Sequence, residues 1–80
     1  MLTGMKPQAF DPKKLKDARE SKTLSLFDAA AKFYNLCDTE RDQITDRTLQ
    51  NWETGFTEPR ASDLEKLAQV YGVKVEAFYR

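Results

Sequence analysis

Apolar residues recur three and four positions apart in several short stretches of this chain, which is the spacing of one face of an α-helix. The first stretch is expected to form a helix from Pro12 to about Lys22, because Asp11 is a good N-cap and proline is favoured at the first helical position. The residues before this helix show no such spacing. We therefore interpret residues 1–11 as an N-terminal arm, either mobile or ordered, and residues 12–80 as one folded domain.

A second helix is expected to begin after Ser25, because Asp28 follows three residues later and completes a near capping box. This helix is able to continue through Leu36. Residues 37–44 are polar and acidic, which is typical of a loop or of a fraying helix end. The inward face of the helix carries the apolar residues Leu26, Ala29, Ala30, Phe33 and Cys37.

The same signals predict a third helix. Thr45 is a good N-cap, Leu49 and Trp52 lie three positions apart, and Gly55 is placed to end the helix in the left-handed conformation. We interpret Trp52 as a core residue rather than as a stacking platform for a base. The outer face is left with Asp46, Arg47, Gln50, Asn51 and Thr54.

A fourth helix is expected at Ser62, which forms a full capping box with Glu65, and Gly72 is expected to end it. Its inward stripe consists of Leu64, Leu67, Ala68 and Tyr71. The apolar residues among 73–79 fit a short last helix. Since no repeat and no convincing strand is present, the sequence predicts an all-α domain of five helices.

Composition argues against several classes of function. The 80 residues contain no His and a single Cys, so the commonest acid–base group and metal ligand is missing, and neither a disulfide nor a paired-cysteine zinc site can form within the chain. We expect no enzyme activity, no metal and no cofactor. No apolar run approaches the ~18 residues of a membrane span, so we expect no membrane partner and a reducing, cytoplasmic location.

The net charge is zero, which by itself does not indicate a nucleic-acid partner. The charges are unevenly distributed along the chain, however. Residues 1–36 carry seven basic and four acidic side chains, whereas residues 37–44 carry one basic and three acidic side chains. The acidic segment is therefore separate in sequence from a positive N-terminal part.

Several pieces of the chain, in order and with the right spacing, resemble the Cro/lambda-repressor-like helix-turn-helix family, also called XRE. The resemblance covers roughly residues 12–79, and its pieces are LKDARESKTLS (15–25), AAAKF (29–33), ITDRTLQNWETG (44–55) and EPRASDLEKLAQVYGVKVEAFY (58–79). It implies a compact five-helix domain that binds a double-stranded DNA operator sequence-specifically. The expected protein is a nucleoid-associated transcriptional repressor of phage, plasmid or bacterial type, working as a homodimer on DNA.

The resemblance also implies which residues meet DNA. The helix at about residues 45–54 would enter the major groove as the recognition helix. Its expected base contacts are Asp46, Arg47, Gln50 and Asn51, whose side chains suit the donors and acceptors of base edges. The expected phosphate contacts are Ser25, Leu26 through its backbone amide, Thr45, Thr48, Thr54, Thr57, Arg60, Lys13 and Lys14.

One further pair matches a salt bridge that some family members form. Arg19 in the first helix and Glu53 in the third are expected to join these two helices, because the planar guanidinium fork can meet a carboxylate with two hydrogen bonds. The prediction requires the charged groups to lie within ~4 Å of each other.

The connection before the recognition helix departs from the family pattern. Residues 33–44 stand where family members have a short turn, so the connection is enlarged by an acidic insertion at about residues 34–43. We expect the second helix to run on by one or more turns and a loop to follow. Because Asp38, Glu40 and Asp42 would repel a phosphate backbone, we expect them to point away from DNA or to contact a partner.

Two alternatives remain open at this point. The acidic insertion and the zero net charge also suit a protein-interaction module that uses the same fold to bind a toxin, an antirepressor or another protein. In addition, Phe27, Tyr34 and Phe56 fall where the family often has polar residues. These aromatic side chains either fill space around the insertion or form an exposed patch for dimerisation.

Overall fold

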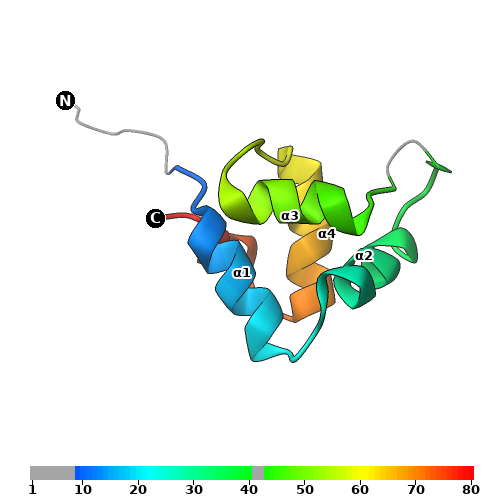
Figure 1. Ribbon diagram of the computed structural model, residues 1–80, viewed down its shortest axis with the longest axis horizontal. Helices are drawn as coiled ribbons and strands as arrows, with labels where there is room; N and C mark the ends of the chain where they lie inside the picture. Colours follow the sequence, from blue (N-terminus) through cyan, green and yellow to red (C-terminus); the bar gives the residue numbers. More distant parts are fainter. Residues whose placement is uncertain (1–8, 41–42) are drawn as a thin grey trace.

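The computed structural model describes residues 9–40 and 43–80, which form a small helical domain (Figure 1). Within these residues no β-strand is present apart from an isolated bridge between Phe10 and Tyr79. The elements are α1 (Pro12–Ser21), α2 (Leu26–Tyr34), α3 (Asp46–Thr54), α4 (Ala61–Tyr71) and the 3-10 helix η2 (Val75–Phe78). The fifth expected helix is thus a short 3-10 helix and not an α-helix.

The first three α-helices begin where the sequence predicts. In α1 the Asp11 side chain accepts a hydrogen bond from the Lys13 backbone N–H at 3.0 Å. The Ser25 hydroxyl accepts from the N–H of the third residue of α2 at 3.0 Å, and the Thr45 hydroxyl accepts from the Thr48 N–H of α3 at 3.2 Å. Each bond satisfies a backbone donor that the first turn of a helix otherwise leaves unpaired.

The prediction that α2 runs on through Leu36 is wrong. The helix ends at Tyr34, and two tight turns follow, in which Leu36 N–H donates to the Phe33 carbonyl at 2.9 Å and Cys37 N–H donates to the Tyr34 carbonyl at 3.0 Å. Ending the helix here turns Cys37 back onto the core, where its thiol donates to the Phe33 carbonyl at 3.3 Å.

The predicted start of α4 is also wrong. The helix begins at Ala61, so Ser62 is its second residue and not the N-cap that a capping box with Glu65 requires. Instead, the buried carboxylate of Asp63 accepts a hydrogen bond from the Arg60 backbone N–H at 3.0 Å. Asp63 therefore performs at the third helical position the role expected of Glu65.

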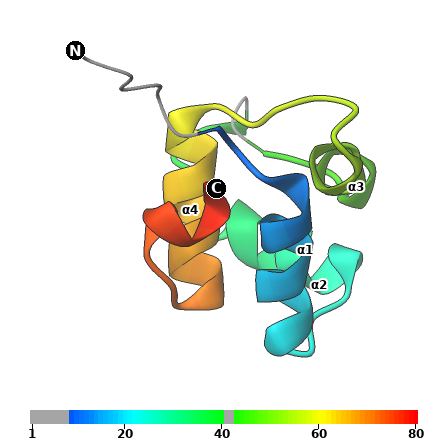
Figure 2. The same cartoon turned by 90° about the vertical axis from the view of Figure 1, so that its left-hand side faces the viewer.

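One continuous core holds the helices together. It is formed by Leu15, Ala29, Phe33, Leu49, Trp52, Leu64, Leu67, Ala68, Tyr71 and Phe78. The rings of Phe33 and Trp52 meet edge to face with their centroids 6.4 Å apart, which joins α2 to α3. Figure 2 shows α3 end-on at the edge of the molecule, on the side away from α4. One face of α3 is therefore packed on the core, and the opposite face looks outward.

The described part of the predicted N-terminal arm is ordered against the other end of the chain. Asp11 N–H donates to the Phe78 carbonyl at 2.8 Å, and Arg80 N–H donates to the Ala9 carbonyl at 2.9 Å. These bonds flank the bridge between Phe10 and Tyr79. The rest of the arm, residues 1–8, lies outside the described residues.

Candidate nucleic-acid interface

The inner face of α3 is fixed to α1 by an ion pair. Arg19 Nε lies 2.8 Å from Glu53 Oε2, and Arg19 Nη2 lies 3.0 Å from Oε1, so the pair expected from the sequence is present with two parallel bonds. A third bond runs from Arg19 Nη1 to the Leu24 carbonyl at 2.7 Å. The hydrogen bonds that Arg19 donates to the Glu53 carboxylate raise the pKa of Arg19 above its usual value. Both side chains are buried, so α3 has little freedom to shift along α1.

The outer face of α3 brings together three of the four expected base-contacting residues. Arg47, Gln50 and Asn51 line a shallow hollow together with Thr54 and Phe56, and we call this surface the α3 hollow. Arg47 and Gln50 are exposed, and Asn51 is half-buried. The three side chains offer guanidinium and amide groups, which form paired hydrogen bonds with guanine and adenine edges.

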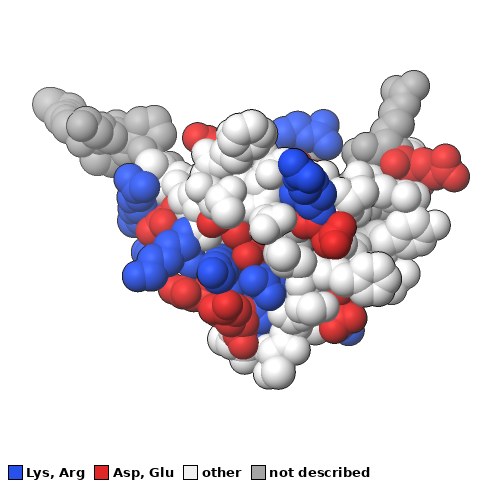
Figure 3. All heavy atoms as spheres, viewed as in Figure 1, with Lys and Arg blue, Asp and Glu red and all other residues white. Residues whose placement is uncertain are grey.

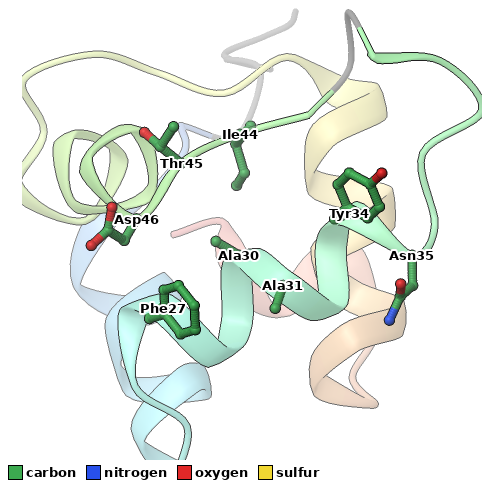
Figure 4. A pocket seen from close by; sticks show the side chains of 8 residues that line it. All are labelled: Phe27, Ala30, Ala31, Tyr34, Asn35, Ile44, Thr45 and Asp46. Carbon is green, nitrogen blue, oxygen red and sulfur yellow. The ribbon is translucent and has the colours of Figure 1, made fainter.

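Asp46 lies apart from these three residues. It lines a second hollow between α2 and the start of α3, which we call the α2 hollow (Figure 4). The other residues around it are Phe27, Ala30, Ala31, Tyr34, Asn35, Ile44 and Thr45. The Asp46 carboxylate accepts a hydrogen bond from the Arg47 backbone N–H at 2.9 Å, and the residue is exposed. Asp46 therefore occupies the flank of α3 that faces α2, at the edge of the candidate interface.

The turn after α3 is organised by the carbonyl of Asn51. This oxygen accepts hydrogen bonds from the Thr54 hydroxyl at 3.2 Å, the Phe56 N–H at 3.0 Å and the Thr57 N–H at 3.3 Å. Gly55, with φ of 82°, supplies the left-handed residue that this turn requires. Asn51, whose side chain is a candidate base contact, thus also fixes the backbone of the following turn through its carbonyl.

The expected phosphate-contacting residues lie in three places. Ser25 and Leu26 form the start of α2, where the hydroxyl is exposed and the leucine side chain is half-buried. Thr45 and Thr48 stand at the start of α3 with their hydroxyl oxygens 3.2 Å apart. The exposed residues Thr54, Thr57 and Arg60 surround the turn after α3.

The basic candidates differ in their surroundings. The Arg60 side chain is 69% exposed, with its Nε 3.4 Å from the Asp63 carboxylate. Lys13 and Lys14 are exposed at the start of α1, and the ammonium group of Lys14 donates to the Tyr79 carbonyl at 2.8 Å. Lys14 is therefore tied to the C-terminal segment, and neither lysine is among the residues that line the α3 hollow.

Charge is unevenly distributed over the molecule. Figure 3 shows basic and acidic side chains interleaved over α1, and mostly uncharged side chains around α3. The acidic side chains next to the undescribed part of the α2–α3 connection gather at the end of the molecule away from α1. Asp38 and Glu40 of this connection are exposed, whereas Asp42 lies outside the described residues. At α3 itself, the exposed carboxylate of Asp46 lies at the start of the helix, on the flank that faces α2.

The sequence did not indicate that Phe56 belongs to this surface. Its ring is 79% exposed and lines the α3 hollow. No local signal indicates it, because the residue after the glycine that ends a helix usually packs against that helix. Phe27 and Tyr34 are exposed as well, but they lie on the α2 hollow.

Two further observations concern other kinds of site. Among residues 9–40 and 43–80, no group of three or more His, Cys, Asp or Glu side chains is placed to hold a metal ion. In the same part of the chain, no helix is both long enough and apolar enough to cross a bilayer.

Comparison with known families gives one match. Residues 15–78 match the family model described as helix-turn-helix, which covers most of the chain and includes all four α-helices from Leu15 onward as well as η2. No curated protein and no solved structure gives a significant match. The geometry agrees with the family match, because α3 follows α2 in the chain and its exposed outer face carries polar side chains. The chain therefore belongs to the Cro/lambda-repressor-like, or XRE, family of helix-turn-helix DNA-binding regulators.

Proposed function

We propose that this chain binds double-stranded DNA sequence-specifically, with α3 in the major groove, and represses transcription by occupying an operator. The observation that carries the proposal is the grouping of Arg47, Gln50 and Asn51 on the outer face of a helix whose inner face is fixed by a buried ion pair. Because the backbone of α3 is already fixed, DNA binding would carry no free-energy cost for ordering it.

Each candidate base-contacting residue suits a particular base. Arg47 suits the two acceptors on a guanine edge, and Asn51 and Gln50 suit the donor and acceptor of an adenine edge. Asp46, on the flank of α3, suits the amino group of a cytosine. Side chains that line one hollow address neighbouring base pairs, so a short contiguous half-site is expected.

Phosphate contacts orient the domain on the duplex. The start of α2 offers the exposed Ser25 hydroxyl and the first backbone amides of the helix, which favour an anion. Thr45 and Thr48 offer hydroxyl groups on the other side of the same junction. Beyond α3, the Thr54 and Thr57 hydroxyls and the Arg60 guanidinium would follow the backbone, and Lys13 and Lys14 would add longer-range attraction. These contacts carry no sequence information.

A homodimer is the expected form on DNA, because a two-fold operator presents two half-sites about one helical turn apart. The test is selection of the purified protein on a randomised duplex pool, followed by sequencing of the bound fraction. An enriched inverted repeat supports specific recognition by a dimer and gives the half-site spacing. An enriched single site supports recognition by a monomer, and no enrichment at low salt by a folded protein contradicts the proposal.

A protein-interaction module is the second candidate, and the α2 hollow favours it. Phe27 and Tyr34 are 71% and 54% exposed at this hollow, and Asp38 and Glu40 are exposed in the connection that follows. A toxin or antirepressor with an apolar, basic surface would match these features. The discriminating measurement is the salt dependence of DNA binding, because phosphate contacts make affinity fall steeply with salt.

A further inference from the structure

Three α-helices of this domain end in the same backbone motif, and this allows their neighbouring residues to be compared. In each, a residue in the left-handed conformation is followed by one whose N–H donates to a carbonyl five positions earlier. The three residues after the left-handed position are Leu24 behind α1, Phe56 behind α3 and Val73 behind α4.

These three equivalent residues have different surroundings. Leu24 and Val73 are partly buried against the core, which is the hydrophobic contact that usually accompanies this motif. Phe56 is 79% exposed, although its N–H donates to the Asn51 carbonyl at 3.0 Å in the same way. The largest of the three side chains is therefore the one that the fold does not use for packing.

The location of Phe56 indicates its partner. Its ring lines the α3 hollow beside Arg47, Gln50 and Asn51, so a base pair that reaches these polar groups also reaches the ring. Within the major groove, the 5-methyl of thymine is the apolar group that a base edge offers to such a ring. The hydrogen bonds of Asn51 and Gln50 to adenine would place the paired thymine in the same base pair.

We infer that Phe56 is a specificity-determining residue that reads the 5-methyl group of a thymine next to the bases contacted by Asn51 and Gln50. The inference rests on the proposed function and adds to it an apolar contact. Because the turn that carries Phe56 is bonded to the Asn51 carbonyl, the ring keeps its position relative to the polar readers. Of the described residues, those that line the hollow include Arg47 and no acidic side chain, so no carboxylate lies beside the ring there.

The experiment uses the duplex that the wild-type protein selects from the randomised pool. Each thymine of that duplex is replaced in turn by deoxyuridine, which lacks only the 5-methyl group. At one position we expect the wild-type affinity to fall by about three- to five-fold, the factor that corresponds to the burial of one methyl group. Phe56→Ala should bind the thymine duplex more weakly by a similar or larger factor and should lose nothing further with deoxyuridine.

Phe27→Ala is the matched control, because Phe27 is 71% exposed but lies on the α2 hollow. It should keep the full response to deoxyuridine. Circular dichroism and sedimentation of each variant show whether fold or oligomeric state has changed. A change of oligomeric state in Phe56→Ala with an unaltered deoxyuridine response overturns the inference in favour of a dimer contact.

The inference and the proposed function fail in different ways. A selected duplex at which deoxyuridine is tolerated everywhere, or at which Phe56→Ala and wild type respond equally, overturns the role of Phe56 and leaves DNA recognition intact. A pool from which no duplex is enriched overturns both.

Discussion

Arg19 is the single side chain on which the placement of α3 depends most. It makes two hydrogen bonds to the Glu53 carboxylate and one to the Leu24 carbonyl, and it is 9% exposed. Truncation would leave a buried carboxylate without its partner, which costs far more than the net contribution of an intact pair. The cost of losing Arg19 is therefore expected to exceed what the intact ion pair adds to stability.

We expect Arg19→Ala to lower the free energy of unfolding by about 3–5 kcal/mol, because it removes one partner of a buried pair. The measurement is urea denaturation followed by circular dichroism. Arg47→Ala is the control, since that side chain is exposed on α3 and its truncation should change stability by no more than about 0.5 kcal/mol. Equal effects of the two substitutions would contradict the importance of burial.

Tyr71 carries a polar atom that the core does not satisfy. The side chain is fully buried against Phe78, and among the described residues its hydroxyl is the buried side-chain group without a hydrogen-bond partner. Tyr71→Phe removes this hydroxyl and should raise the free energy of unfolding at pH 7 by about 1 kcal/mol. Thermal melting of the two proteins tests this, and a lower melting temperature for Tyr71→Phe would show that the hydroxyl has a partner.

The same residue predicts a dependence on alkaline pH. Burial raises the pKa of Tyr71, so the folded state keeps the phenol proton at a pH where the unfolded chain releases it. The free energy of unfolding is therefore unaffected by Tyr71 below the ordinary tyrosine pKa of about 10. Above that pH it falls by about 1.4 kcal/mol per pH unit. Denaturation at pH 9 and pH 11 should therefore show a larger loss for wild type than for Tyr71→Phe, and parallel losses would contradict the prediction.

Substitutions of Arg47 and Arg60 test the proposed division between base contacts and phosphate contacts. If Arg47 contacts a guanine, Arg47→Ala should weaken binding to the selected duplex by about 1–3 kcal/mol and relax the preference at one base pair. Arg60→Ala should weaken binding to all duplexes alike and reduce the salt slope by about one. Titration against single-base variants at several salt concentrations distinguishes these outcomes. An equal loss on every sequence for Arg47→Ala would remove it from the readers.

At the scale of elements, the start or the end of a helix was predictable where one short side chain or a glycine marks it, as Gly55 and Gly72 do at the ends of α3 and α4. Asp11, Ser25 and Thr45 are short polar side chains that cap the next turn directly, so their chemistry is visible in the sequence. The end of α2 depends on the packing of Cys37 against the core, which no local signal reveals. At α4 the sequence allows a capping box of Ser62 with Glu65, but the structure uses Arg60 with Asp63. Asp63 is buried, which the sequence alone does not reveal.

The candidate interface was predictable to a similar extent. Helical periodicity places Arg47, Gln50 and Asn51 on one face and Leu49 and Trp52 on the other. The separation of Asp46 depends on how closely α2 approaches α3, and the exposure of Phe56 depends on where the turn leaves the helix. Both are properties of the tertiary structure.

The end of α1 is the helix terminus with an unfavourable residue. Thr23 has φ of 59°, a left-handed conformation that is unusual for a β-branched side chain, whereas α3 and α4 use Gly55 and Gly72 at the equivalent position. Thr23→Gly should raise the free energy of unfolding by about 1 kcal/mol, because the left-handed conformation costs roughly 1–2 kcal/mol for residues with a Cβ and glycine loses part of this gain as chain entropy. Thr23→Ala keeps a Cβ and is the control. Urea denaturation giving no gain for glycine over alanine would contradict the prediction.

At the scale of the whole molecule, the zero net charge means that long-range attraction to DNA is weak. Basic and acidic side chains alternate over α1, and the surroundings of α3 are largely uncharged (Figure 3). The proposed DNA recognition would therefore depend on short-range fit at α3 more than on electrostatic attraction. This agrees with the α3 hollow, in which an aromatic ring lies beside three candidate base-contacting residues.

The pairing of the two ends of the fold allows the chain to be joined into a ring. Residues 9–11 and 78–80 are hydrogen-bonded to each other, so a short added linker between Arg80 and Ala9 is enough to join them. A circular permutant opened between Arg41 and Asp42 would leave α1, α2, α3, α4 and η2 unbroken. If it folds and selects the same duplex, the order in which the helices are synthesised is irrelevant to recognition, and the acidic connection serves neither folding nor binding as an unbroken loop.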